Sequence, residues 1–80
     1  MDTPLKRLYF VDKEGVHHFV QQGADIERLH KACWEDRQRR GFKESSYIRQ
    51  WVDNGGLWID FGSWSEFYFI DGVTLEDMCK

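Results

Sequence analysis

The chain has 80 residues, of which 31% are charged, 41% hydrophobic and 16% aromatic, and its formal net charge at pH 7 is −3. This length allows one modest hydrophobic core and the composition excludes a disordered chain, so we expect a single compact domain over residues 1–80. No segment has the length and hydropathy of a membrane span, and residues 1–4 do not begin a signal peptide. The sequence therefore predicts a cytoplasmic protein that does not associate with membranes.

A β-hairpin is the first predicted element. Leu8–Val11 has the composition of a strand, Asp12–Gly15 that of a turn, and Val16–Gln21 that of a returning strand. Gly15 can adopt the left-handed backbone conformation that such a turn requires.

A helix is predicted to follow, with Asp25 as its N-cap and Gly41 as its end. Four apolar residues recur at helical spacing and define its buried side: Ile26, Leu29, Ala32 and Cys33. Three arginines lie near its C-terminus, where the helix dipole favours cations: Arg37, Arg39 and Arg40.

Residues 45–55 permit two interpretations. Four apolar residues have the spacing of an amphipathic helix that the glycine pair 55–56 would end: Tyr47, Ile48, Trp51 and Val52. Asn54-Gly55 is also a frequent hairpin dipeptide, and in that alternative residues 47–53 form an extended strand. We favour the helix, because the polar residues of the segment then fall on one side.

The most aromatic stretch, Leu57–Ile70, predicts a second β-hairpin with residues 62–65 as its turn. The first strand alternates, with one face made of Leu57, Ile59 and Phe61 and the other of Trp58 and Asp60. The returning strand is apolar on both faces, which are Phe67 with Phe69, and Tyr68 with Ile70. A half-buried sheet needs only one apolar face, so we expect either the protein's helices or a partner to cover the second.

Residues 74–77 predict a short capped turn at the end of the chain. The elements together predict the α+β class: a small antiparallel sheet of two β-hairpins with one or two helices packed on one face, in the order ββααββ.

The acidic, aromatic half of the chain is the strongest indication of function. Residues 44–80 hold two basic residues against seven acidic ones, and Trp64 is expected at the tip of the second hairpin. Exposed rings among acidic groups are suited to a protein partner with a basic surface. The predicted contacts are Trp58, Asp60, Trp64, Glu66 and Tyr68.

The leading hypothesis is therefore a small non-enzymatic protein-interaction module. A stand-alone inhibitor or modulator of a larger, basic, nucleic-acid-handling protein fits this profile, and small bacteriophage anti-defence proteins are comparable by type alone. Two alternatives stay open. One is a nucleic-acid-binding domain that uses the basic segment Arg37, Arg39, Arg40 and Lys43. The other is a homodimer that pairs its aromatic sheets.

Neither a metal site nor a catalytic centre is predicted. The residues with soft ligand atoms are His17, His18, His30 and Cys33, but neighbouring strand residues such as His17 and His18 point to opposite faces and cannot chelate one ion together. No serine or cysteine stands in a nucleophile context, and the spacing of Cys33 and Cys79 indicates free thiols, with Cys33 buried. We expect no cofactor and no enzymatic activity.

Overall fold

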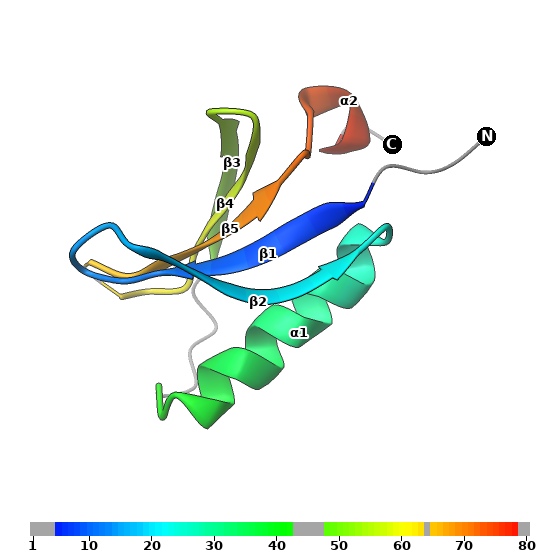
Figure 1. The fold of residues 1–80 in the computed structure, drawn as a ribbon. Helices are drawn as coiled ribbons and strands as arrows, with labels where there is room; N and C mark the ends of the chain where they lie inside the picture. The colour runs from blue at the N-terminus through cyan, green and yellow to red at the C-terminus, as the bar shows by residue number, and fades with distance from the viewer. Residues whose placement is uncertain (1–4, 43–47, 64, 79–80) are drawn as a thin grey trace.

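Five strands and two helices make up the part of the chain that the computed structural model describes, residues 5–42, 48–63 and 65–78 (Figure 1). Their order is β1 (Lys6–Val11), β2 (His17–Gly23), α1 (Ile26–Arg39), β3 (Arg49–Asp53), β4 (Gly56–Asp60), β5 (Phe67–Asp71) and α2 (Leu75–Met78).

The strands form one antiparallel sheet in the order β2-β1-β5-β4-β3. The pairing of β1 with β5 joins the first hairpin to the C-terminal strands, so β2 and β3 form the two edges. Helix α1 runs along the sheet beside β1 and β2 (Figure 1). The predicted α+β class, with an antiparallel sheet, is confirmed.

The first hairpin and the long helix form as predicted. In the turn, the Asp12 carboxylate accepts hydrogen bonds from the backbone N–H groups of Glu14 and Val16, at 2.9 and 3.0 Å. Asp25 caps α1 by accepting the N–H of Glu27 at 2.9 Å. Gly41 has φ +82°, the left-handed conformation that ends a helix.

The prediction of a helix over residues 45–55 is wrong where the structure describes this segment. Arg49–Asp53 is β3, and it pairs with β4 across a two-residue turn in which Asn54 has φ 53° and Gly55 has φ 78°. Positive φ at both central positions is the type I′ geometry that matches the twist of a hairpin. The element order is therefore ββαβββα rather than ββααββ.

The core lies between α1 and one face of the sheet. The sheet supplies Leu8, Phe10, Leu57, Ile59, Tyr68 and Ile70, and α1 supplies Leu29, Ala32 and Cys33. The buried side of α1 continues through Asp36 and Arg37, at the same helical spacing. Cys33 is buried as predicted, and this burial raises the pKa of its thiol to about 12.

Candidate functional site

The face of the sheet opposite α1 carries at least one aromatic side chain from every strand. Tyr9 pairs with Phe19 on one side and with Phe69 on the other, and Trp58 pairs with both Phe69 and Trp51. Directly paired residues of neighbouring strands point to the same face. We call these residues the aromatic row; in sheet order they are Phe19, Tyr9, Phe69, Trp58 and Trp51.

The rings of the row contact one another across the sheet. The centroids of Phe69 and Trp58 are 4.7 Å apart, and those of Tyr9 and Phe19 are 6.0 Å apart in an edge geometry. Trp51 and Trp58 stack with centroids 6.4 Å apart and planes inclined by 11°. Such contacts stabilise beyond the area that they bury.

Two further rings complete what we call the aromatic face, which is the aromatic row together with His17 and Phe67. The His17 ring lies 5.8 Å from both Tyr9 and Phe69 and 6.1 Å from Trp58, so it bridges the row at its centre. Phe67 contacts both tryptophans, at 6.1 and 6.3 Å. The rings thus form one continuous network from edge to edge of the sheet.

The network is buried at its centre and accessible around it. Phe69 is buried, whereas Phe19 is 57% exposed. Four members are partly exposed: Tyr9, Trp51, Trp58 and Phe67. Accessible rings around a buried one are typical of surfaces that bind partners.

Gly56 makes room for the central ring. A Cβ at this position would lie 2.5 Å from two atoms of the Phe69 ring and 2.5 Å from the carbonyl oxygen of Ile70. Only a residue without a side chain permits this approach of Phe69 to β4. Gly56 therefore belongs to the architecture of the aromatic face.

Charged residues border the aromatic row on both sides. On one side Arg7, Asp71 and Asp53 occupy the neighbouring cross-strand row, and all three are exposed. On the other side Arg49 lies 3.4 Å from Asp60, with its guanidinium 5.0 Å from the Trp51 ring. An apolar centre with a polar rim is the usual anatomy of a protein interface.

The predicted partner contacts do not share one surface. Trp58 lies on the aromatic face, and Asp60 is buried beside Arg49. The prediction that Tyr68 is a surface contact is wrong: it is 0% exposed and faces α1, where its hydroxyl donates a hydrogen bond of 2.7 Å to Asp36. Burial, reinforced by this bond to a carboxylate, raises the pKa of Tyr68.

The tip of the second hairpin is described only in part. Glu66 accepts hydrogen bonds from the hydroxyl groups of Ser63 and Ser65, at 2.6 and 3.0 Å. Trp64, the predicted anchor, lies outside the described residues. Its role stays a prediction.

The three described arginines of the basic segment, Arg37, Arg39 and Arg40, do not form one exposed cationic surface. Arg37 is 5% exposed, with its guanidinium 4.8 Å from the Trp34 ring and 5.7 Å from the Phe61 ring. Arg40 donates to the buried carboxylate of Asp36 at 2.6 Å.

Arg40 also lies over the Phe10 ring, at 4.1 Å, so packing as well as charge holds it in place. Arg39 is the most exposed of the three arginines and lies 3.3 Å from Asp36. Lys43 lies outside the described residues. Arg37 and Arg40 therefore pack on rings of the core, whereas Arg39 is exposed at the surface.

The histidines occupy separate places in the fold. His18 contacts the Asp12 carboxylate at 2.7 Å, and this hydrogen bond lowers the pKa of Asp12. His30 on α1 contacts the side-chain oxygen of Gln50 on β3, also at 2.7 Å. Among the described residues no three histidine, cysteine or acidic side chains come together as a metal site.

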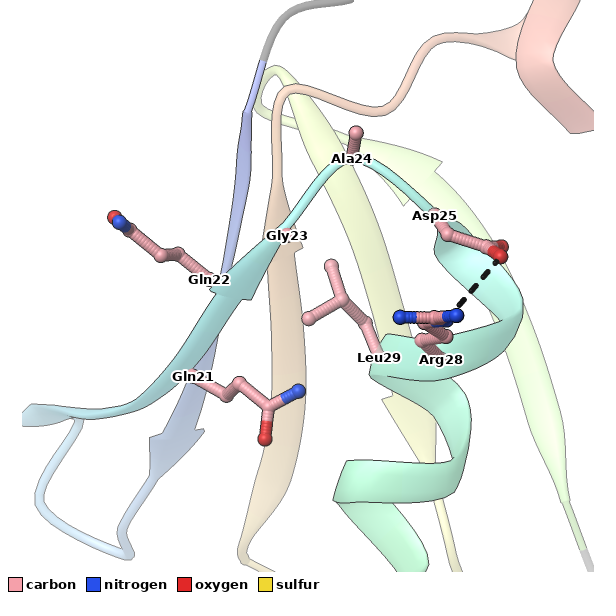
Figure 2. Close-up of a pocket in the computed structure, with 7 residues that line it drawn as sticks. All are labelled: Gln21, Gln22, Gly23, Ala24, Asp25, Arg28 and Leu29. Carbon is pink, nitrogen blue, oxygen red and sulfur yellow. Dashed lines mark ion pairs between the residues drawn. The ribbon is translucent and has the colours of Figure 1, made fainter.

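Two surface pockets flank α1 and offer no catalytic constellation. Figure 2 shows the one of about 300 Å³ at the start of the helix, where Asp25 and Arg28 form an ion pair of 4.0 Å beside Leu29. The other, of about 590 Å³, is lined by Gln21, Glu35, Gln38 and Arg39. Neither lining combines a nucleophile with a general base.

The sequence pattern did not predict most of the aromatic face. Phe67 and Phe69 were assigned to a common face, but Tyr9 and Phe19 were not connected with them because the pairing of β1 with β5 spans most of the chain. The available signal was alternation in the first hairpin, which puts Tyr9 on the face opposite Leu8 and Phe10.

Comparisons with known proteins found no match for this chain. No family model matches the sequence, no curated protein matches it, and no solved structure matches the fold. None of the helices in the described part of the chain is long and apolar enough to cross a membrane.

Proposed function

We propose that this chain is a small non-enzymatic protein-interaction module that binds its partner through the aromatic face. The single observation that supports this proposal is the aromatic row, in which every strand of the sheet contributes one ring to the face opposite α1. Partly exposed tryptophan, tyrosine and phenylalanine side chains are the residues in which interfaces concentrate binding energy.

The charges around the face favour a protein with a basic surface. Asp53 and Asp71 are exposed next to the row, and the chain as a whole carries −3. A single-stranded nucleic acid stacks on similar rings, but it needs a cationic groove for its phosphates. Among the described residues, Arg7 and Arg49 are the arginines beside the row, and Asp71 and Asp60 adjoin them.

A partner with a basic surface suggests a more specific role for the chain, which is to occupy a nucleic-acid-binding groove. Proteins that handle nucleic acids carry positively charged grooves, and an acidic, ring-rich surface is complementary to such a groove. The chain would then act as a stand-alone inhibitor or modulator that occupies the groove in place of the nucleic acid. Competition with an oligonucleotide for the captured partner tests this narrower role.

Affinity capture from a lysate of the organism that encodes the chain tests the proposal. The tagged protein, its Phe19→Ala variant and its Leu75→Ala variant are compared, with and without nuclease. Phe19 and Leu75 are both exposed apolar residues, at 57% and 67%, but only Phe19 belongs to the aromatic face. We expect a stoichiometric protein that survives nuclease and binds the Leu75→Ala variant, but binds the Phe19→Ala variant at least about tenfold more weakly.

Two results would contradict the proposal. Equal capture by the Phe19→Ala and Leu75→Ala variants would remove the aromatic face from the interface. Capture that disappears with nuclease would replace the protein partner with a nucleic acid.

A further inference from the structure

The two edge strands of the sheet differ in their fitness to pair with another chain. At β2 the register with β1 shifts between Leu8 and Tyr9, and α1 packs beside the strand. Such a bulge interrupts the regular ladder that an added strand requires. β3 pairs with β4 from Arg49 to Asp53 without any shift, and in the described part of the chain no strand lies on its other side.

The backbone groups of β3 divide between its two sides. Asp53 and Gly56 flank the two-residue turn and are therefore a hydrogen-bonded pair of the β3–β4 ladder. Because bonded residues alternate along an antiparallel strand, Trp51 also points its N–H and C=O groups toward β4. Gln50 and Val52 consequently direct theirs toward the free edge.

The side chains of β3 are self-complementary in charge. Arg49, Trp51 and Asp53 alternate onto the aromatic face, with Trp51 at the middle of the strand. A rotation of the strand by 180° about an axis through Trp51 and perpendicular to the sheet places Arg49 at the position of Asp53, and Asp53 at the position of Arg49. Asp53 is exposed, and the Arg49 side chain is 63% exposed despite its contact with Asp60.

We propose that β3 pairs in antiparallel register with β3 of a second copy of this chain, with Trp51 at the two-fold axis. In this register Arg49 of each copy lies opposite Asp53 of the other. Gln50 lies opposite Val52, so the outward N–H groups of one strand meet the outward C=O groups of the other. A guanidinium has five donors, so Arg49 can bind Asp53 of the second copy without leaving Asp60.

The same register brings the two Trp51 side chains together. They form a pair without mutual backbone hydrogen bonds, the type in which cross-strand side chains approach most closely. The aromatic rows of the two copies then continue into one another across the dimer. This inference goes beyond the proposed function and does not depend on it, because it concerns an edge of the sheet and requires no foreign partner.

A pair of charge-reversal variants tests the proposal by sedimentation. Arg49→Asp and Asp53→Arg each place like charges opposite each other in a homodimer, whereas a mixture of the two variants restores both opposite-charge pairs. We expect the wild-type protein to dimerise, each variant alone to dimerise at least about tenfold more weakly, and the equimolar mixture to recover the dimer. Native mass spectrometry of the mixture should show the mixed species.

A second pair of variants, at Gln50, controls for misfolding. This control is needed because the substitution of Arg49 also removes its contact with Asp60. Gln50→Pro removes an outward N–H group and leaves the bonds to β4 in place, while Gln50→Ala retains that N–H group. We expect Gln50→Pro to weaken the dimer and Gln50→Ala to leave it unchanged. A monomeric wild-type protein at millimolar concentration, or variants that dimerise as the wild type does, would overturn the proposal.

Discussion

The two faces of the sheet are built by the same five strands and are nevertheless opposite in character. The face under α1 is closed by aliphatic side chains together with Phe10 and Tyr68, and the Tyr68 hydroxyl donates a hydrogen bond to the buried Asp36. The other face is closed only at its centre, by rings that pack on one another and stay partly exposed. Hydrophobicity alone therefore does not identify a core: the covered face is packed under α1, whereas the open face keeps apolar rings partly accessible to solvent.

Substitution of Phe10, on the face under α1, should cause the largest loss in the free energy of unfolding. Phe10 is buried under α1 and contacts Tyr68 and Phe42, with centroids 5.4 and 6.0 Å apart. We expect Phe10→Ala to lower the free energy of unfolding by about 3–5 kcal/mol, because it leaves a cavity between helix and sheet. Urea denaturation followed by circular dichroism measures this change, and a loss below about 1 kcal/mol would mean that α1 does not depend on this face.

Removal of the Tyr68 hydroxyl should give the next largest effect. Tyr68→Phe deprives the buried Asp36 of a donor at 2.7 Å, which we expect to cost about 1.5–3 kcal/mol. The folded chain also holds the phenol proton to higher pH than the unfolded chain, whose tyrosines titrate near about 10. The stability that this difference provides is complete below that pH and is lost as the pH rises above it.

Unfolding measured from neutral to alkaline pH checks both parts of the Tyr68 prediction. The wild-type protein should lose stability more steeply than Tyr68→Phe once the pH exceeds the ordinary pKa of tyrosine. Parallel curves for the two proteins would contradict both the burial of the Tyr68 hydroxyl and its hydrogen bond to Asp36.

A substitution at Gly56 should show how tightly the open face is packed. Gly56→Ala puts a Cβ within 2.5 Å of the Phe69 ring and of a backbone oxygen, so we expect it to destabilise by about 1–3 kcal/mol. Gly23→Ala is the matched control, because its Cβ meets only Leu29, at 3.8 Å. Equal thermal stabilities of the two variants would indicate that both the Phe69 ring and the backbone at Ile70 shift without cost.

The smallest effect on stability is expected at Phe19, on the same hairpin as Phe10 and facing the other way. Phe19→Ala removes a ring that is 57% exposed, and we expect the free energy of unfolding to change by no more than about 0.5 kcal/mol. If this variant also loses partner capture, as expected, the result would show that the Phe19 ring contributes to binding and not to stability. Destabilisation as large as that of Phe10→Ala would abolish the distinction.

The alternation of Leu57–Ile70 predicted which residues share each face of the second hairpin, because successive residues of a strand point to opposite faces. It did not predict which apolar face meets α1. The loop between β4 and β5 is longer than a two-residue turn and does not fix the register, so Tyr68 was grouped with Trp58 although the two point to opposite faces.

The failure at β3 has a related cause. Trp51 and Val52 are both apolar, and in a strand they lie on opposite faces, so the polar alternation that usually marks a strand is missing. The decisive signal was the Asn54-Gly55 turn, whose positive φ angles outweigh the helical spacing. Arg37 was assigned to the cationic end of α1 and, in one alternative, to a nucleic-acid-binding segment, although it continues the spacing of Leu29 and Cys33 on the buried side of the helix.

The stacking of Trp51 on Trp58 has a spectroscopic consequence. Two indoles whose centroids lie 6.4 Å apart are close enough to couple their electronic transitions, and we expect this coupling to contribute to the ultraviolet circular dichroism spectrum. Each of the two rings belongs to the surface proposed for binding, and Trp51 also lies on the edge proposed for dimerisation. The protein thus carries an intrinsic optical reporter, without any attached label, at the place where its associations are expected to occur.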